Sequence, residues 1–323
     1  MTEIKVQLTR RAALLGAGGA LAGASLAGST VVQAAAEKQG AVPTPVARYS
    51  VGGFEVTTLH DGAVSLQEPQ KTFAMNVGAD EFSAVNAENF LPDDGFQISF
   101  TPTLVNTGSE LVLFDTGNGE GARPARGNLR SALENAGYSA DQVDVVVLTH
   151  MHPDHIGGLM EGGGPAFPNA RYVTGQKEYD FWSGMDPEAN GVTKLLATNV
   201  KPLAEKTTFL DDGGSVVSGI TAMAANGHTP GHMIYMIEND GKKLALTADT
   251  ANHYVWSLAH PEWEVRFDMD KEAAAATRKS VFGMLAADKV PFVGYHMPFP
   301  AVGYVEASGS GFRYVPASYQ LNL

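Results

Sequence analysis

The sequence predicts an α+β fold in which β-sheets lie inside and helices lie outside. Most apolar runs are short, as is typical of strands, and several are bounded by Gly, Pro or Asn-Asp-Gly turn signals. Few segments place apolar residues at helical spacing. Hydrophobic residues make up 44% of the 323 residues and charged residues 18%, a globular balance that excludes a disordered chain. Periodicity alone leaves open whether the strands form one sheet or two packed sheets.

Each expected strand is a short apolar or β-branched run that ends at a turn. Val143–Leu148 is almost entirely apolar, so we expect it to be buried on both faces. Asn239-Asp240-Gly241 is a strong hairpin signal between two of the runs. In chain order the expected strands are Phe54–Leu59, Ile98–Asn106, Leu111–Phe114, Val143–Leu148, Arg171–Thr174, Val216–Ala222, Met233–Ile237, Leu244–Thr247, Pro291–Tyr295 and an edge strand at Gly311–Val315.

Three segments are expected to be helical. Leu129–Ala136 has apolar residues at helical spacing and is followed by Gly137, a residue that favours the end of a helix. Gln176–Trp182 follows an expected strand and forms the second helix. Asp270 can accept hydrogen bonds from the free N–H groups at the start of a third helix, from Lys271 to about Ala287.

The first 36 residues have the features of an export signal. Thr9-Arg10-Arg11 precedes a run of Ala, Leu and Gly, and Ala34-Ala35-Ala36 is typical of a cleavage site. The arginine pair resembles a twin-arginine signal, so we expect a periplasmic or secreted protein without stable membrane insertion after cleavage. A membrane anchor is the alternative, although the many glycines make the run weakly apolar. We expect a flexible, Pro-containing leader over residues 37–53 and one domain over residues 54–323.

Composition excludes several classes of function. The formal net charge is −13, from 35 acidic and 22 basic residues, whereas a protein that binds nucleic acid normally presents a basic face. Cysteine is absent, which excludes disulfides, thiolate metal sites and a cysteine nucleophile. We therefore expect a small-molecule partner and no nucleic acid.

A dense histidine cluster follows the buried strand that is expected at Val143–Leu148, in the sequence Thr-His-Met-His-Pro-Asp-His. Alternate residues of an extended chain point to the same side, so His150 and His152 can share one metal ion. Because proline ends the strand, Asp154 and His155 project from the following turn and can reach a second ion. Several imidazoles and a carboxylate held together without metal would be costly to bury.

Other chemically active residues follow three further expected strands. The motif Gly-His-Thr-Pro-Gly-His carries His228 and His232, one strand ends at Ala-Asp with Asp249, and another ends at Tyr-His with His296. Three more histidines lie outside these motifs. His60, beside Asp61-Gly62, fits a turn, His253 can line a pocket, and His260 has no motif support.

In their order along the chain, the four motifs resemble the metallo-β-lactamase-fold hydrolases, over a region from Phe54 to about Pro316. The resemblance implies a four-layer αββα sandwich with two divalent metal ions per chain. Zinc is the expected metal, and manganese, iron, cobalt and nickel also suit nitrogen and oxygen ligands. In the implied site one ion is held by His150, His152 and His232, the other by Asp154, His155 and His296, and Asp249 bridges the two.

Two further residues would support this site without binding metal. His228, the first histidine of Gly-His-Thr-Pro-Gly-His, is implied to be structural. Asp115, in Leu-Phe-Asp-Thr-Gly, matches an aspartate that orients the ligand loop.

The C-terminal part resembles the methyl parathion hydrolase branch and its lactonase relatives, through Arg266-Phe-Asp-Met-Asp, His296-Met-Pro-Phe-Pro and Gly311-Phe-Arg-Tyr-Val-Pro. This implies a hydrolase of small neutral ester-like substrates: lactones, aryl esters or organophosphate triesters, with lactones and carboxylic esters favoured. A hydroxide shared by the two ions would be the nucleophile. Either water or Asp154 would protonate the leaving group. We expect an apolar pocket wall made by Phe73, Phe181, Trp182, His253, Tyr254, Trp256 and Phe299.

Three other classes of function are weighed against a hydrolase. A redox enzyme on the same fold, such as a flavodiiron reductase or a mononuclear iron sulfur dioxygenase, would replace His152 by Glu or would not need Asp249 as a bridge. A metal-storage protein needs no bridging carboxylate, and β-lactamases usually lack an aspartate at the position of Asp249. The natural substrate, the metal and the oligomeric state stay open, with a homodimer among the options.

Overall fold

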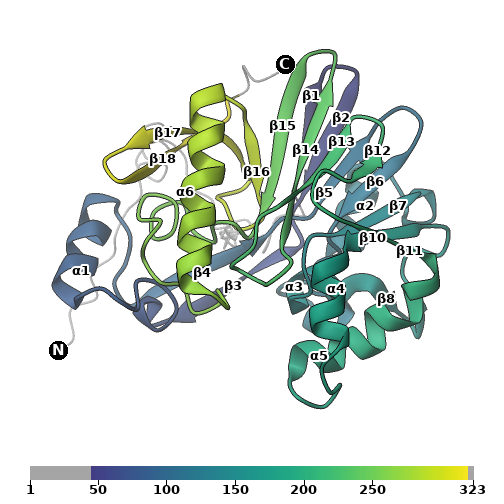
Figure 1. Cartoon of the computed structure of the whole chain (residues 1–323), viewed down its shortest axis with the longest axis horizontal. Helices are drawn as coiled ribbons and strands as arrows, with labels where there is room; N and C mark the ends of the chain where they lie inside the picture. Colours follow the sequence, from purple (N-terminus) through teal and green to yellow (C-terminus); the bar gives the residue numbers. More distant parts are fainter. Residues whose placement is uncertain (1–44, 319–323) are drawn as a thin grey trace, which may run out of the picture. The chain divides into compact units, whose positions relative to one another are not determined.

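The computed structural model describes residues 45–318 and contains two seven-stranded β-sheets (Figure 1). The first sheet has the order β1-β2-β5-β6-β7-β10-β11, and the second runs from β12 to β18 in chain order. The predicted signal at residues 1–36 lies outside the described residues. No helix within residues 45–318 is long and apolar enough to cross a membrane.

The first sheet combines antiparallel and parallel pairs. Strand β6 pairs antiparallel with β5 and parallel with β7, and β10 pairs parallel with both β7 and β11. Its strands are β1 Val46–Val51, β2 Phe54–Leu59, β5 Thr103–Asn106, β6 Leu111–Phe114, β7 Val145–Leu148, β10 Arg171–Gly175 and β11 Thr207–Leu210.

The second sheet is antiparallel except for the parallel pair β15–β16. Its strands are β12 Ser215–Val217, β13 Ile220–Ala224, β14 Met233–Asn239, β15 Lys242–Ala248, β16 Phe292–Gly294, β17 Val302–Ser308 and β18 Gly311–Pro316. The predicted hairpin joins β14 to β15. Asp240 and Gly241 both have positive φ, 49° and 73°, as a two-residue turn of this kind requires.

Two separate hairpins accompany the sheets: β3 Gly62–Gln67 with β4 Gly95–Phe100, and β8 Met160–Glu161 with β9 Gly164–Pro165. The α-helices are α1 Ala79–Glu88, α2 Leu129–Asn135, α3 Pro153–Ile156, α4 Gln176–Ser183, α5 Gly191–Leu195 and α6 Lys271–Asp288. Short helical turns cover residues 69–71, 120–122, 140–142, 157–159 and 196–206.

Strand β7 shows why the molecule is layered. Val145 and Val147 belong to the core between the two sheets, whereas Val146 and Leu148 pack with residues of α2 and α4 on the other face. Successive side chains of a strand point to opposite faces, so a wholly apolar strand is buried twice, as the sequence predicts. Helix α6 packs against β17 of the second sheet (Figure 1). Helices therefore lie outside the two sheets, and the predicted αββα order is confirmed.

A third apolar cluster supports the β3–β4 hairpin. Phe73, Phe82, Phe96 and Trp256 are all buried and meet at ring-centroid distances between 5.2 and 5.7 Å, with Phe82 and Phe96 each contacting Trp256. The indole Nε1 of Trp256 donates to the Asn86 side chain on α1 at 2.7 Å. The cluster thus joins α1, the hairpin and the chain that follows β15.

The structure differs from the sequence prediction at element boundaries and in elements that were not predicted, among them β1, β3, α1, β11 and β17. The expected strand Ile98–Asn106 is two strands, because Thr101-Pro102 interrupts it and proline cannot donate to a ladder. The expected strand Val216–Ala222 is also two strands, which turn at Gly219 with φ 82°. The flexible leader predicted over residues 37–53 is wrong for its last part, because Val46–Val51 pairs with β2.

Candidate metal centre

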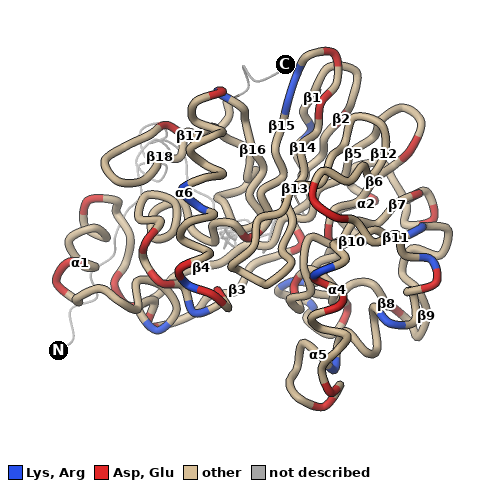
Figure 2. The backbone as a smooth tube through the Cα atoms, in the orientation of Figure 1, with Lys and Arg blue, Asp and Glu red and all other residues tan. Residues whose placement is uncertain are grey.

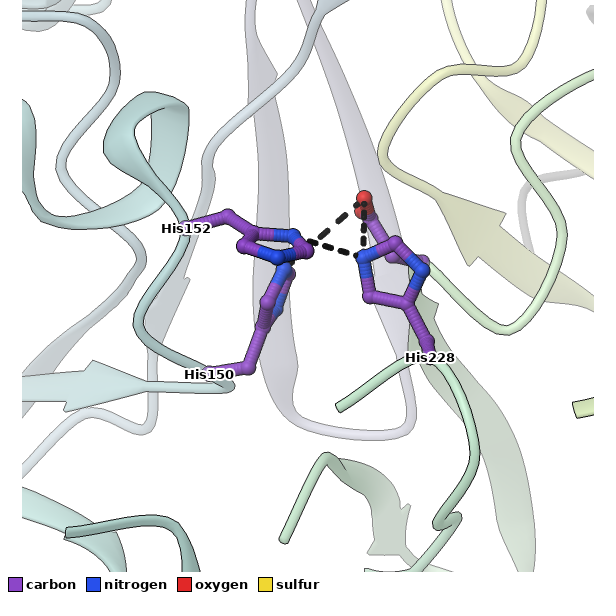
Figure 3. Close-up of side chains that lie close together, drawn as sticks. His150, His152 and His228 are labelled. Carbon is purple, nitrogen blue, oxygen red and sulfur yellow. Dashed lines mark hydrogen bonds and ion pairs between the residues drawn. The ribbon is translucent and has the colours of Figure 1, made fainter. Parts of the chain in front are cut away.

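The predicted ligand residues lie at the ends of strands. β7 leads directly to His150, α3 carries Asp154 and His155, the β13–β14 connection carries His228 and His232, and β15 and β16 are followed by Asp249 and His296 respectively. Figure 3 shows the imidazole of His228 facing those of His150 and His152, which lie together on the segment that follows β7. Residues far apart in sequence therefore meet at one place.

The first group consists of His150, His152, His228 and Asp249, whose donor atoms all lie within 4.8 Å of one another. Nδ1 of His152 lies 2.9 Å from Nε2 of His228, and that Nε2 lies 3.2 Å from Oδ2 of Asp249. Nε2 of His150 lies 3.9 Å from the same carboxylate oxygen. Burial lowers the pKa of His152 to about 3, so this imidazole is neutral and has a free lone pair.

The second group consists of Asp154, His155, Asp249 and His296. Nε2 of His155 lies 3.5 Å from Oδ2 of Asp154 and 3.2 Å from Oδ1 of Asp249. Nε2 of His296 lies 3.5 Å and 3.1 Å from Oδ2 of Asp154 and of Asp249. Burial raises the pKa of Asp154, but the facing imidazoles of His155 and His296 outweigh it and lower the pKa to about 2. Asp249 belongs to both groups, which matches its predicted bridging position.

The donor set fits divalent metal ions. Nε2 of His150, Nε2 of His155 and Oδ1 of Asp249 are buried and make no hydrogen bond with any described residue. Buried polar atoms in folded proteins are normally satisfied, so three such atoms without a hydrogen-bond partner in one cluster fit the binding of a cation. Five imidazoles and two carboxylates, without sulfur, suit zinc and several other transition metals.

One predicted ligand is not in either group. His232 lies beside the site, but its Nε2 accepts a hydrogen bond from the main-chain N–H of Asp249 at 3.1 Å, and its Nδ1 lies 3.1 Å from the Ala225 carbonyl oxygen. Both ring nitrogens thus face main-chain groups. In the structure His228, which the motif was expected to use structurally, belongs to the first group, and the predicted ligand His232 lies beside that group.

The outer nitrogens of the other histidines face fixed acceptors. Nδ1 of His155 lies 2.8 Å from Oδ2 of Asp115, and Asp115 also accepts from the main-chain N–H and the hydroxyl of Thr149, both at 2.9 Å. Nδ1 of His296 lies 2.8 Å from the Ser99 carbonyl oxygen. Such contacts fix the tautomer and direct Nε2 toward the centre. The predicted supporting position of Asp115 is confirmed.

Glu178 on α4 joins two of the ligand-bearing loops and was not singled out from the sequence. Oε1 accepts from the main-chain N–H of Met151 at 3.0 Å, and Oε2 accepts from the Thr229 hydroxyl at 2.8 Å and the Gly231 N–H at 2.9 Å. Trp182 Nε1 donates to Oε1 as well. A Cβ on Gly231 would lie 2.2 Å from the Glu178 main-chain nitrogen, so only glycine allows this approach. The only feature that marks Glu178 as important is its full burial on a helix, and burial cannot be read from the sequence.

His228 is held by a buried ion pair. Its Nδ1 lies 3.0 Å from Oδ1 of Asp268, and Arg278 donates to Oδ2 of the same carboxylate at 2.7 Å. Burial opposes protonation of His228, but hydrogen bonds with Asp249 and Asp268 raise its pKa to about 9. Asp268 lies in the segment Arg266-Phe-Asp-Met-Asp that carries the family resemblance, which gave it no role.

The histidines outside the motifs have other surroundings. The His60 ring meets Phe299 edge-on at 5.4 Å, the His253 ring stacks on Trp256 at 4.0 Å, and the His260 ring stacks on Trp263 at 3.9 Å.

A cavity of about 460 Å³ opens beside the second group. Its apolar wall is the β3–β4 hairpin, through Val64, Leu66, Ile98 and Phe100, together with Phe267. The remaining lining residues are Asn118, Arg126, His152, Pro153, Asp154, Asp249, Arg266 and His296. The volume suits a small organic molecule.

The seven predicted wall residues do not line this cavity. Phe73 and Trp256 are buried behind the hairpin, and Trp182 is buried with its indole on Glu178. Proximity in sequence to the ligand motifs misidentified the wall, because alternating residues of β3 and β4 expose smaller aliphatic side chains on the cavity side.

The chain resembles known proteins of one family. The model of the metallo-beta-lactamase superfamily matches residues 101–291. AidC, a dizinc quorum-quenching lactonase solved with the product N-hexanoyl-L-homoserine, superposes with a TM-score of 0.80 at 29% identity, over 85% of this chain and 98% of that chain. The hydrolase AbOPH of the beta-lactamase superfamily superposes with a TM-score of 0.78 at 26% identity, over 86% and 99%.

Curated relatives are more distant in sequence. The uncharacterized protein YobT of Bacillus subtilis (strain 168) is 24% identical over 216 residues, which cover 61% of this chain and 84% of that protein. An N-acyl homoserine lactonase of Bacillus cereus is 25% identical over 165 residues, 50% of this chain and 60% of that enzyme. The match therefore spans less than two thirds of the lactonase. Because the family model covers more than half of the chain, and the fold and the paired ligand groups agree with it, the chain belongs to the metallo-β-lactamase superfamily.

Proposed function

We propose that the chain is a dinuclear metal-dependent hydrolase of small molecules with a neutral ester-like bond, with lactones and aryl esters favoured over organophosphate triesters. The observation that carries this proposal is the sharing of Asp249 by two groups beside a cavity of suitable size. The two solved neighbours with TM-scores of 0.78 and above, a dizinc lactonase and a hydrolase, support it. The resemblance of the C-terminal segments to the methyl parathion hydrolase branch supports the same class of substrate.

We propose that His150, His152 and His228 hold one ion, that Asp154, His155 and His296 hold the other, and that Asp249 touches both. Two zinc ions are our first choice. When bound, such ions supply Lewis acidity and lower the pKa of a water molecule toward neutrality. The chain itself fixes the imidazole tautomers through Asp115, Asp268 and the Ser99 carbonyl. Asp154 lines the cavity as a carboxylate of low pKa, so it can accept a proton there, and either it or water would pass a proton to a leaving group.

The apolar wall excludes water from one side of a bound substrate. Val64, Leu66, Ile98 and Phe100 alternate with outward-facing residues of the hairpin, so an acyl or aryl group can pack on them. We further propose export to the periplasm or outside the cell, which Thr9-Arg10-Arg11 and Ala34-Ala35-Ala36 support. N-terminal sequencing of exported protein tests this, with a new terminus expected near Glu37.

The direct test is a substrate panel. The purified, metal-loaded protein is assayed against homoserine lactones, aryl esters and paraoxon-type triesters, ranked by kcat/KM, with His152→Ala and His60→Ala as the variant and its control. We expect hydrolysis of at least one lactone or ester, loss of most activity in His152→Ala and little change in His60→Ala. A kcat/KM for triesters tenfold above every lactone and ester, about 1.4 kcal/mol in transition-state stabilisation, would reverse the substrate order.

A further inference from the structure

Two arginines line the cavity without a carboxylate partner. Of the arginines within residues 45–318, five form ion pairs with Asp or Glu: Arg123, Arg130, Arg171, Arg278 and Arg313. A sixth, Arg48, donates to the Thr57 hydroxyl and the Ala136 carbonyl. Only Arg126 and Arg266, in this described part of the chain, have terminal guanidinium nitrogens that contact no acceptor, and both line the cavity.

Arginines without a carboxylate partner are unusual in so acidic a chain. Acidic residues outnumber basic ones by 35 to 22, and basic positions are interspersed with acidic ones along the tube in Figure 2. A surface arginine therefore finds a carboxylate easily. The only acidic residues that line the cavity are Asp154 and Asp249, which belong to the candidate metal centre. The cavity thus contains two cationic groups that are available to a ligand.

Arg126 is held in place although its terminal nitrogens are free. Its Nε donates to Oδ1 of Asn118 at 3.0 Å. Asn118 in turn donates through its main-chain N–H and its side chain to Oδ2 of the buried Asp61, both at 3.0 Å. The main-chain N–H groups of Gly127 and Leu129 donate to the Asp61 carboxylate at 3.0 and 2.9 Å, which fixes the loop on the C-terminal side of Arg126.

Arg126 and Arg266 anchor near opposite ends of β3. The carbonyl oxygen of Ala125, next to Arg126, accepts from the Ala63 N–H at 3.2 Å, at the start of the strand. The main-chain N–H of Arg266 donates to the Thr72 carbonyl at 2.7 Å, beyond the end of the strand. The Arg266 guanidinium is 5.2 Å from the centre of the Phe267 ring. The apolar wall therefore lies between the two cationic positions.

We propose that the substrate carries a carboxylate in addition to its ester-like bond, and that Arg126 binds this carboxylate. This inference rests on the proposed function. A guanidinium presents two parallel N–H donors that match a carboxylate, and an arginine already fixed through Nε loses little freedom on binding it. Arg266 adds positive charge at the far end of the wall. The ester-like bond that reacts is then neutral, as expected from the sequence. The whole substrate is an anion, with an apolar segment between the carboxylate and that bond.

The test uses a matched pair of substrates. One is the mono-4-nitrophenyl ester of adipic acid, which has a free carboxylate, and the other is its methyl ester, which has the same chain without the charge. We expect wild-type kcat/KM to favour the free carboxylate by about 10- to 100-fold, the usual worth of a hydrogen bond to a charged group. Arg126→Met should make the two substrates nearly equal, Arg126→Lys should keep part of the preference, and rising salt should reduce it in wild type only.

Arg130→Met is the matched control. Arg130 is on α2, is exposed, pairs with Glu161 at 3.6 Å and does not line the cavity. We expect this variant to keep the wild-type substrate ratio. A wild-type preference for the methyl ester, or equal ratios in wild type and Arg126→Met, would overturn the inference while leaving ester hydrolysis intact.

A binding measurement separates the two proposals. Monomethyl adipate is titrated into chelator-treated protein by calorimetry, where no metal can hold the carboxylate. Arg126-dependent binding without hydrolysis of either adipate ester or of any member of the substrate panel would support the arginine site and refute the proposed function. If wild-type and Arg126→Met proteins bind equally, or neither binds, the arginine site is refuted whatever the enzyme hydrolyses.

Discussion

Nδ1 of His228 lies 3.0 Å from Oδ1 of Asp268, a residue 40 positions away, at the start of the segment that leads into α6. Arg278 is fully buried. Its guanidinium donates to the other carboxylate oxygen of Asp268 and to the Pro261 carbonyl. The pair keeps a hydrogen on Nδ1 of His228, so Nε2 is the nitrogen that can lose its proton to bind a metal ion. Nε2 is therefore directed at the first ligand group by contacts made in the second half of the chain.

Asp268→Asn should weaken the first metal site. The amide removes the negative charge that orients His228, and loss of such a partner typically reduces metal affinity by about 10- to 100-fold. Competition with a chromophoric chelator measures this. Asp270→Asn is the control, because Asp270 accepts from the Ala273 N–H at the start of α6 and touches no ligand. Equal metal affinities in the two variants would mean that Asp268 has only a structural role.

His228→Ala and His232→Ala should have different effects on metal content. His228 belongs to the first group, whereas both nitrogens of His232 face main-chain groups. We expect elemental analysis to find one ion per chain fewer in His228→Ala. His232→Ala should keep both ions but lose about 1–3 kcal/mol of stability, because it leaves the buried Asp249 N–H without an acceptor. Loss of an ion in His232→Ala alone would restore the ligand set expected from the sequence.

Glu178→Gln should destabilise the protein through two loops at once. The carboxylate accepts four hydrogen bonds, including those from Met151 and Gly231, and burial raises its pKa, although these donors oppose the rise. The amide nitrogen of glutamine replaces one carboxylate oxygen and cannot accept the hydrogen bonds which that oxygen accepts. We therefore expect the free energy of unfolding, measured in urea, to fall by about 1–3 kcal/mol. The exposed neighbour Lys177 provides the control, and Lys177→Ala should change stability by less than about 0.5 kcal/mol.

The sequence predicts the layers and most of the site because both depend on local patterns. The wholly apolar run of β7 predicts a strand that is buried on both faces. The residues that follow it directly include His150, His152, Asp154 and His155. What the sequence does not reveal depends on tertiary packing. Either histidine of Gly-His-Thr-Pro-Gly-His could reach the centre by spacing alone, and the contacts of His232 with Ala225 and Asp249 depend on tertiary packing that spacing does not show.

The cavity wall was missed for a related reason. The prediction weighted large aromatic residues near the ligand motifs, yet Trp256 and Phe73 are buried in a cluster behind the hairpin. Val64 and Leu66 alternate with half-buried and exposed residues in a strand that has no strong apolar run. Their role appears only when β3 pairs with β4 next to the metal centre.

The metal-free protein should lose stability as the pH rises from about 6.5 to about 9. In this form hydrogen bonds with Asp249 and Asp268 outweigh burial and raise the pKa of His228 from 6.5 to about 9. A raised folded-state pKa stabilises the protein below the unfolded value, and this stabilisation is lost as the pH rises through the folded value. The shift corresponds to about 3 kcal/mol. Chemical unfolding of chelator-treated protein at several pH values measures this loss, and His228→Gln should flatten the slope.

Metal should reverse that dependence. A ligand imidazole must be neutral at Nε2, so binding at the first group has to displace the proton from His228, and metal affinity should increase with pH over the same interval. Calorimetry in two buffers of different ionisation enthalpy counts the protons released. We expect wild type to release about one proton more than His228→Gln near pH 7.5. Equal release by the two proteins would show that His228 is neutral before metal binds, and the raised pKa would then be wrong.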